Sequence, residues 1–161
     1  MSLLLDNDFH HRIDLFEPGD KTGLICVDVP EVQRLVVENL TEIEYKIHTG
    51  LFLEDILLKL QTHSYDVVVV AEHFNASNKE NNPILDAIRN IPANQRRGQM
   101  VVLVGSSVHT DSEMDAWALS VDLVLNLSDV PNLKHVVRRA VTRRNSFYKP
   151  LIEAYEAAGT S

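Results

Sequence analysis

The chain has 161 residues, of which 45% are apolar and 24% are charged, and its formal net charge is −8. A chain of this size can bury the core of one globular domain, and its single cysteine, Cys26, excludes an internal disulfide framework and is typical of a reducing cytoplasm. No apolar stretch is long enough to span a membrane, and the negative charge disfavours general nucleic-acid binding, so we expect a cytoplasmic protein.

The first half of the chain alternates between predicted strands and helices. Residues 1–21 carry scattered apolar side chains and end in the turn-like EPGD, which indicates an N-terminal arm. GLICV (23–27) predicts a buried strand, and Pro30 opens an amphipathic helix over 30–43. YKIHT (45–49) predicts a short strand, and the apolar stripe from Leu53 to Leu60 predicts a second helix.

The stretch YDVVVVAEHF (65–74) predicts a third strand. Its four consecutive valines indicate a parallel strand that is buried on both faces. In open α/β sheets, functional groups lie just beyond the carboxyl ends of the strands, so Ala71 and Glu72 are the residues to consider here.

The second half continues the alternation. Pro83 opens a helix, MVVLV (100–104) predicts a fourth strand, and DLVLNL (122–127) a fifth. Asp111 or Ser112 can cap a helix whose apolar side includes Met114 and Trp117. The last helix is predicted to start from a cap at Ser128 or Asp129 and carries Leu133, Val136, Val137, Ala140 and Val141.

This order of elements predicts a three-layer α/β fold, with helices on both faces of a five-stranded parallel sheet. Residues 145–161 extend the last helix and keep apolar residues at helical spacing, among them Phe147, Leu151 and Tyr155. Such a stripe must be covered, either by the N-terminal arm, by a second copy of the chain or by a neighbouring domain.

Three stretches together resemble the receiver domain of bacterial two-component response regulators. They are VDVPEV (27–32), TGLFLEDILLKLQTHSYDVVVV (49–70) and SVDLVL (120–125), and the resemblance covers about residues 22–144. It implies a flavodoxin-like sheet of order 2-1-3-4-5 and a role in signal transduction.

The resemblance also implies positions for a phosphorylation site, and most of them have lost the required residue. Asp28 stands at the first magnesium-binding acid of receivers, but Val29 replaces the second. Ala71 stands at the phosphoacceptor aspartate, and Gly105, followed by Ser106, at the threonine or serine that contacts the phosphoryl group.

The remaining two positions lie in and after the fifth strand. Leu127, or Asn126 after a slip of one residue, stands at the lysine that pairs with the phosphate, and Val124 at the aromatic switch residue. Phosphoryl transfer to a carboxylate needs both the metal and the cation. The sequence therefore predicts a pseudo-receiver that is not an enzyme and holds neither cofactor nor metal.

Glu72 leaves alternatives open. If the register differs by one residue, Glu72 falls on the acceptor position and could stand in for a phosphorylated aspartate, as a residual switch of a longer regulator. The simpler interpretation is a solvent-facing glutamate at the strand end. A small α/β enzyme could instead use Glu72, His73 and Ser106 or Ser107, and His73 could pair with His109, although two separate loop histidines are the simpler interpretation.

The arginines of RRAVTRR (138–144), which include Arg138, Arg139 and Arg143, form a solvated face, a protein-docking face or a nucleic-acid patch. Nucleic acid is disfavoured because acidic residues dominate elsewhere and no aromatic residue interleaves with the arginines. Receivers commonly dock through their fourth and fifth helices and the strand between them. The resemblance therefore implies a protein partner or a homodimer through the last helix and its extension.

Overall fold

The computed structural model describes residues 12–50, 52–74 and 81–159, without the side chains of 147–152 and 155. Five parallel strands form one sheet in the order β2-β1-β3-β4-β5, as predicted. They are β1 (Lys21–Cys26), β2 (Tyr45–Thr49), β3 (Val67–Ala71), β4 (Met100–Gly105) and β5 (Leu123–Asn126).

The valine run forms the central strand because it is apolar on both sides. Val67, Val68, Val69 and Val70 are fully buried, and β3 pairs with β1 on one side and with β4 on the other. Alternate valines belong to the two cores of the protein, one on each face of the sheet.

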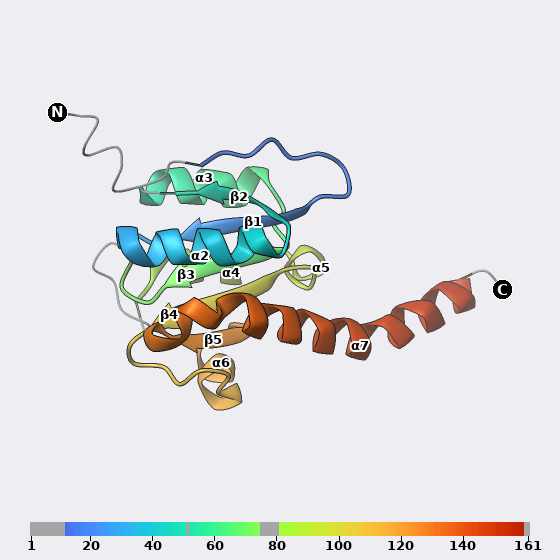
Figure 1. Cartoon of the computed structure of the whole chain (residues 1–161). Helices are drawn as coiled ribbons and strands as arrows, with labels where there is room; N and C mark the ends of the chain where they lie inside the picture. The colour runs from blue at the N-terminus through green and yellow to red at the C-terminus, as the bar shows by residue number, and fades with distance from the viewer. Residues whose placement is uncertain (1–11, 51, 75–80, 160–161) are drawn as a thin grey trace.

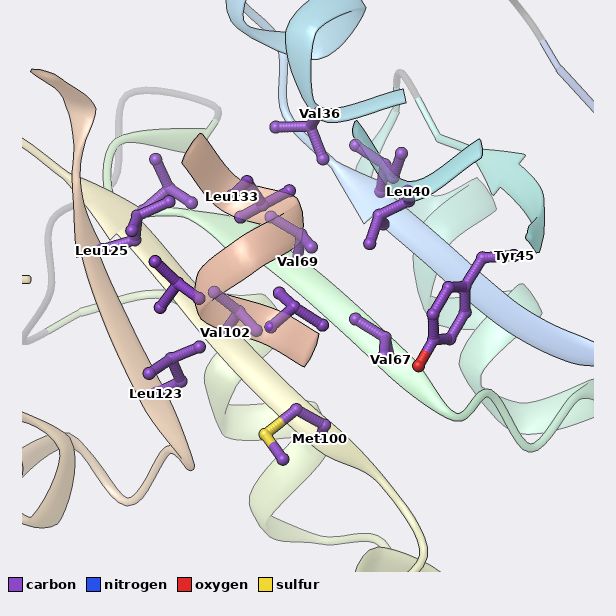
Figure 2. Close-up of a cluster of buried hydrophobic side chains, with 14 of the residues drawn as sticks. Val36, Leu40, Tyr45, Val67, Val69, Met100, Val102, Leu123, Leu125 and Leu133 are labelled. Atoms are coloured by element: carbon purple, nitrogen blue, oxygen red, sulfur yellow. The ribbon is translucent and has the colours of Figure 1, made fainter. Parts of the chain in front are cut away.

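Helices cover both faces of the sheet (Figure 1). α2 (Pro30–Glu42) and α7 (Leu133–Gly159) pack on one face, where the buried cluster drawn in Figure 2 joins their side chains to β3, β4 and β5. α3 (Leu53–Thr62), α4 (Pro83–Arg89) and α6 (Glu113–Leu119) pack on the other face. The short helix α5 (Ala93–Arg96) was not predicted, because four residues are too few to show a period.

The start of the last helix differs from the prediction. Ser112 does cap α6, where its side chain accepts from the backbone of Asp115. However, a 3₁₀ helix, η2 (Leu127–Asn132), precedes α7, and Asn126 caps it by accepting from the N–H of Ser128. The expected helix cap at Ser128 or Asp129 is therefore wrong.

The described part of the N-terminal arm lies along β2, the edge strand. Ile13 forms an antiparallel bridge with His48, the N–H of Asp14 donates to Ile47 O at 3.1 Å, and the N–H of Thr49 donates to Arg12 O at 2.9 Å. The arm thereby covers backbone groups that an edge strand would otherwise expose.

Helix α7 continues without interruption from Leu133 to Gly159 and extends past the body of the domain (Figure 1). The side chains of Phe147, Leu151 and Tyr155, which were predicted to form an apolar stripe, lie outside the described part of the chain. The division into arm, domain and extension at residues 21/22 and 144/145 stays a prediction. None of the described helices is both long and apolar enough to cross a membrane.

Candidate functional site

The residues of the predicted receiver pocket follow or end strands at the carboxyl edge of the sheet. Ala71 ends β3 opposite Val104, and Gly105 ends β4 opposite Asn126. Asp28 and Val29 follow β1, which is the other neighbour of β3. Parallel pairing therefore gathers these residues at one edge of the sheet, and their role as a site stays a prediction.

Glu72 is the residue whose surroundings differ most from expectation. Its side chain is only 1% exposed, so the interpretation as a solvent-facing glutamate is wrong. The N–H of Glu72 donates to Val104 O at 2.8 Å, which extends the β3–β4 pairing by one residue. The side chain then runs across the end of β4 over Gly105.

Gly105 provides the space that Glu72 uses. A Cβ atom at residue 105 would lie 2.5 Å from Oε1 and 2.7 Å from Cβ of Glu72, which is closer than real side chains approach. The resemblance placed a threonine or serine of receivers at this position. Here the missing side chain is what allows the carboxylate to lie over the strand end.

The Glu72 carboxylate is held by polar groups, as a buried charge requires. Its Oε2 accepts a short hydrogen bond from the Ser107 hydroxyl, and Oε1 accepts from the Ser107 N–H at 3.3 Å. Nε2 of the exposed His73 lies 3.2 Å from Oε1. Ser107, and not its exposed neighbour Ser106, is therefore the serine that reaches the glutamate.

Asn82 fixes the other side of the same strand end. Its buried amide group donates to Ala71 O at 3.3 Å and to Glu72 O at 3.4 Å. Its Oδ1 accepts from the N–H groups of Ile84 and Leu85, which caps α4. One side chain thus joins the end of β3 to the start of a helix.

The β4–α6 loop (residues 106–112) is also bonded to β5. The Asn126 amide group donates to Val108 O at 2.8 Å and to Ser106 O at 3.4 Å. The N–H of Asp111, a residue with a positive φ of 60°, donates to Val124 O at 2.9 Å. The loop is therefore attached at both of its ends.

Contacts to η2 and α7 complete the attachment of this loop. Thr110 Oγ1 accepts from the N–H of Asn126 at 2.9 Å and donates to the carboxylate of Asp129. The Asp111 carboxylate accepts from Arg143 at 3.2 Å and from Arg139 at 3.4 Å. Two of the three predicted docking arginines thus contact the loop, while Arg138 is exposed.

The other positions that the resemblance assigned to the receiver site differ in their exposure to solvent. Asp28 is half-buried, Val29 is 52% exposed, and Leu127, which offers no cation, is 40% exposed. Val124 is fully buried in the core and has no ring to turn. Among the described residues no three His, Cys, Asp or Glu side chains come together as a metal site.

The histidines at this edge do not form a pair. His73 contacts Glu72, whereas Nδ1 of the exposed His109 lies 3.6 Å from the carboxylate of Asp115. The structure thus places the two histidines beside different carboxylates, which agrees with the simpler interpretation of two separate loop histidines.

A large cavity lies at the opposite, amino-terminal edge of the strands. It has a volume of about 1090 Å³, and among the residues that line it are Lys21, Tyr45, Arg97, Met100 and Arg144. None of the predicted site residues whose side chains are described lines this cavity.

An exposed apolar surface on α6 was missed. Met114 and Trp117, one helical turn apart, are 80% and 84% exposed, so their predicted place on the core side of α6 is wrong. Ala116 is the buried residue of this helix. A helix of seven residues gives too few positions to decide from its period which side faces the core.

Comparison with solved structures identifies the fold. The chain is similar to the chemotaxis response regulator CheY4 of Vibrio cholerae (TM-score 0.54, 15% identity, 73% of this chain and 98% of that chain). It is similar to an orphan response regulator of H. pylori (TM-score 0.56, 13% identity, 77% and 98%). It also matches a chain in the complex of the histidine kinase ThkA with the response regulator TrrA (TM-score 0.56, 25% identity, 74% and 97%).

No protein-family model matches the sequence, and no curated protein matches it either. The similarity to solved structures therefore shows the fold, and the strand order agrees with it.

Proposed function

Since the chain has the fold of response-regulator receiver domains, we propose that it is a receiver-like protein-interaction module that works without phosphorylation and without catalysis. One observation carries this proposal. The position of the acceptor aspartate is Ala71, while the carboxylate of the next residue, Glu72, is buried and bonded to the β4–α6 loop.

The chemistry of the strand ends supports the absence of phosphotransfer. A methyl group at Ala71 cannot attack phosphorus, and Asp28 followed by Val29 provides a single carboxylate for a magnesium ion that favours several oxygen ligands. Leu127 supplies no positive charge to offset the phosphoryl group.

Glu72 gives the module a built-in anion in place of a transient one. Both carboxylate oxygens accept hydrogen bonds from Ser107, and charge-assisted bonds of this kind are stronger than neutral ones. We infer that the glutamate holds the β4–α6 loop in one arrangement at all times. Binding of a partner beside this loop would then depend on the concentration of the partner and not on a phosphorylation cycle.

A titration with Mg²⁺ and beryllofluoride, followed by proton–nitrogen NMR of residues 1–161, tests this function. The proposal predicts no saturable shifts at Asp28, Ala71 or Gly105. Saturable, Mg²⁺-dependent shifts that spread to Val124 and α7 would show a working phosphate site and overturn it.

The partner surface that we propose joins α6 to α7. It combines the exposed Met114 and Trp117 with Arg138, Arg139 and Arg143, and a protein partner or a second copy of the chain would bury the apolar pair. The complex that contains a histidine kinase and a response regulator supports a protein as partner. The extension with Phe147, Leu151 and Tyr155 would continue this surface.

Sedimentation of Trp117→Ala and Leu58→Ala tests the surface for self-association. Leu58 is an exposed apolar residue on α3 (59%) and serves as the control. We expect wild type and Leu58→Ala to associate and Trp117→Ala to remain monomeric. If all three proteins are monomers, the surface serves a different protein, and if Trp117→Ala still associates, self-association uses another face.

A further inference from the structure

The N-terminal arm is attached to the sheet around one histidine. Besides the two backbone bonds to β2, the Asp14 carboxylate accepts from the N–H of Ile47 at 2.7 Å, and the N–H of Arg12 donates to the Thr49 side chain at 2.8 Å. His48 lies between Ile47 and Thr49, and its side chain is buried. The bonds described here between residues 12–14 of the arm and β2 therefore lie within one residue of His48.

A neutral ring satisfies both hydrogen bonds of His48. Nε2 lies 3.0 Å from the carbonyl oxygen of Asp14, and because a carbonyl only accepts, Nε2 must carry a proton. Nδ1 lies 2.8 Å from the hydroxyl of Tyr65. Burial raises the pKa of Tyr65, so this hydroxyl keeps its proton and donates it to Nδ1.

Protonation of His48 would break this arrangement. An Nδ1–H group would point at the Tyr65 oxygen, and the hydroxyl proton would need another acceptor in a place where Tyr65 is almost fully buried. The arm contributes to the burial, because the ring of Phe16 stacks on the His48 ring with centroids 4.0 Å apart and planes 8° from parallel. The new charge would therefore lie beneath an arm residue.

The charged groups around His48 come from the arm and from α3. The arm brings Asp14, which is paired with Arg12 at 3.0 Å. Lys59 of α3 is paired with Asp55 at 2.5 Å, and His63 follows the helix with its ring centroid 5.1 Å from that of His48.

Burial lowers the pKa of His48, and His63 and Lys59 lower this pKa further, while the contacts with Asp14 oppose the shift. Tyr65, which precedes β3, and Cys26 of β1 add no charge near the ring, because burial raises the pKa of both groups and keeps them neutral.

We propose that His48 makes the N-terminal arm a pH-responsive cover of the β2 edge, and that protonation of its ring releases residues 12–16 from the sheet. Release would expose the N–H and C=O of Ile47 and the N–H of Thr49, which are the groups that an added strand pairs with. The sign follows from the lowered pKa. The attachment is complete above the ordinary histidine value of 6.5 and weakens as the pH falls below it.

Amide hydrogen exchange of the full chain between pH 8 and pH 5, corrected for the intrinsic rate at each pH, tests this proposal. Below the ordinary histidine pKa of 6.5, the opening constant of the Asp14, Ile47 and Thr49 amides should rise about tenfold for each unit by which the pH falls. The reason is that one proton is coupled to opening. Val102 in the central part of the sheet is the internal control and should show no such rise.

Two variants identify the side chain whose protonation releases the arm. His48→Gln can still donate to Asp14 O and cannot titrate, so its arm should exchange independently of pH, whereas His63→Gln should behave as wild type. Arm protection that does not change with pH in wild type, or a pH dependence that disappears in His63→Gln, would overturn the proposal. If His48→Gln does not fold, the NMR titration of the His48 ring in wild type decides, since its midpoint must coincide with that of arm release.

Discussion

The carboxylate of Glu72 lies in the space that a side chain at residue 105 would need. A Cβ atom on Gly105 would be 2.5 Å from Oε1 and 2.8 Å from Cδ of Glu72. The two residues belong to neighbouring strand ends and depend on each other: the glycine lets the glutamate cross β4, and the glutamate then reaches Ser107 on the far side.

Gly105→Ala should destabilise the protein by about 1–3 kcal/mol, because the new methyl group overlaps a buried side chain. In a Glu72→Ala background the same change should cost less, since the overlap with Oε1 and Cδ is gone and only the overlap with Cβ remains. Urea denaturation of the four proteins of this double-mutant cycle measures the coupling. Gly98→Ala is the control, because a Cβ there meets only Gln95 O at an ordinary 3.5 Å. Equal costs in both backgrounds would contradict the described packing.

Ser107→Ala should cost about 1–3 kcal/mol of unfolding free energy, because it leaves a buried carboxylate without its hydroxyl donor. Ser106→Ala is the matched control, since this exposed neighbour makes no side-chain hydrogen bond within the described residues. Thermal denaturation should lower the Tm of the first variant and leave that of the second nearly unchanged. The reverse order would show that Glu72 is held by the other serine.

Thr110→Val should destabilise the protein by about 1–2 kcal/mol, because the side chain is nearly isosteric but loses both hydrogen bonds of the hydroxyl. The N–H of Asn126 and the carboxylate of Asp129 would each lose a partner. Guanidinium denaturation gives the free energy, and Thr62→Val, at an exposed residue that bonds only within α3, gives the reference. A cost no larger than that of Thr62→Val would mean that water replaces these bonds.

Asp14 should contribute to stability near neutral pH and lose this contribution in acid. Burial raises its pKa, but the bonds from Arg12 and from the N–H of Ile47 outweigh this, so the folded pKa lies below the ordinary 3.8. The stabilisation is therefore complete above the unfolded pKa and is lost as the pH falls through the folded pKa. Asp14→Asn should show a flatter decline of unfolding free energy from pH 5 to pH 2 than wild type. Parallel curves would contradict the lowered pKa.

The sequence predicted the sheet well because each buried strand is a continuous apolar run with its own boundaries. GLICV, the valine run and MVVLV each form a strand, with ends shifted by no more than two residues. Their alternation with helices predicted the parallel sheet, and the resemblance to receivers implied its strand order. The carboxyl edge could be found for the same reason.

Burial of Glu72 could not be predicted, because it depends on a glycine that is 33 positions later in the chain and adjacent only after β3 and β4 pair. The sequence showed only that Gly105 lacks the hydroxyl group of the receiver threonine or serine. No neighbouring residue in the sequence indicates that the space left by the missing side chain is filled by Glu72. The pairing of the arm with β2 was not predicted, because the arm lacks the alternation of apolar and polar residues that indicates a strand. Arg12 and Asp14 bind the edge of β2 through backbone groups and through the Asp14 carboxylate.

The most direct test of the central claim is amide hydrogen exchange of the β4–α6 loop in Glu72→Ala, with Glu38→Ala on the surface of α2 as the control. If Glu72 replaces the phosphoryl group as the anion that holds the loop, the protection factors of the Ser107 and Asp111 amides should fall about tenfold, which corresponds to the loss of one hydrogen bond. The protection factor of the Val102 amide should stay the same. Unchanged protection at Ser107 and Asp111 would contradict the claim, because the loop would then be held without the glutamate.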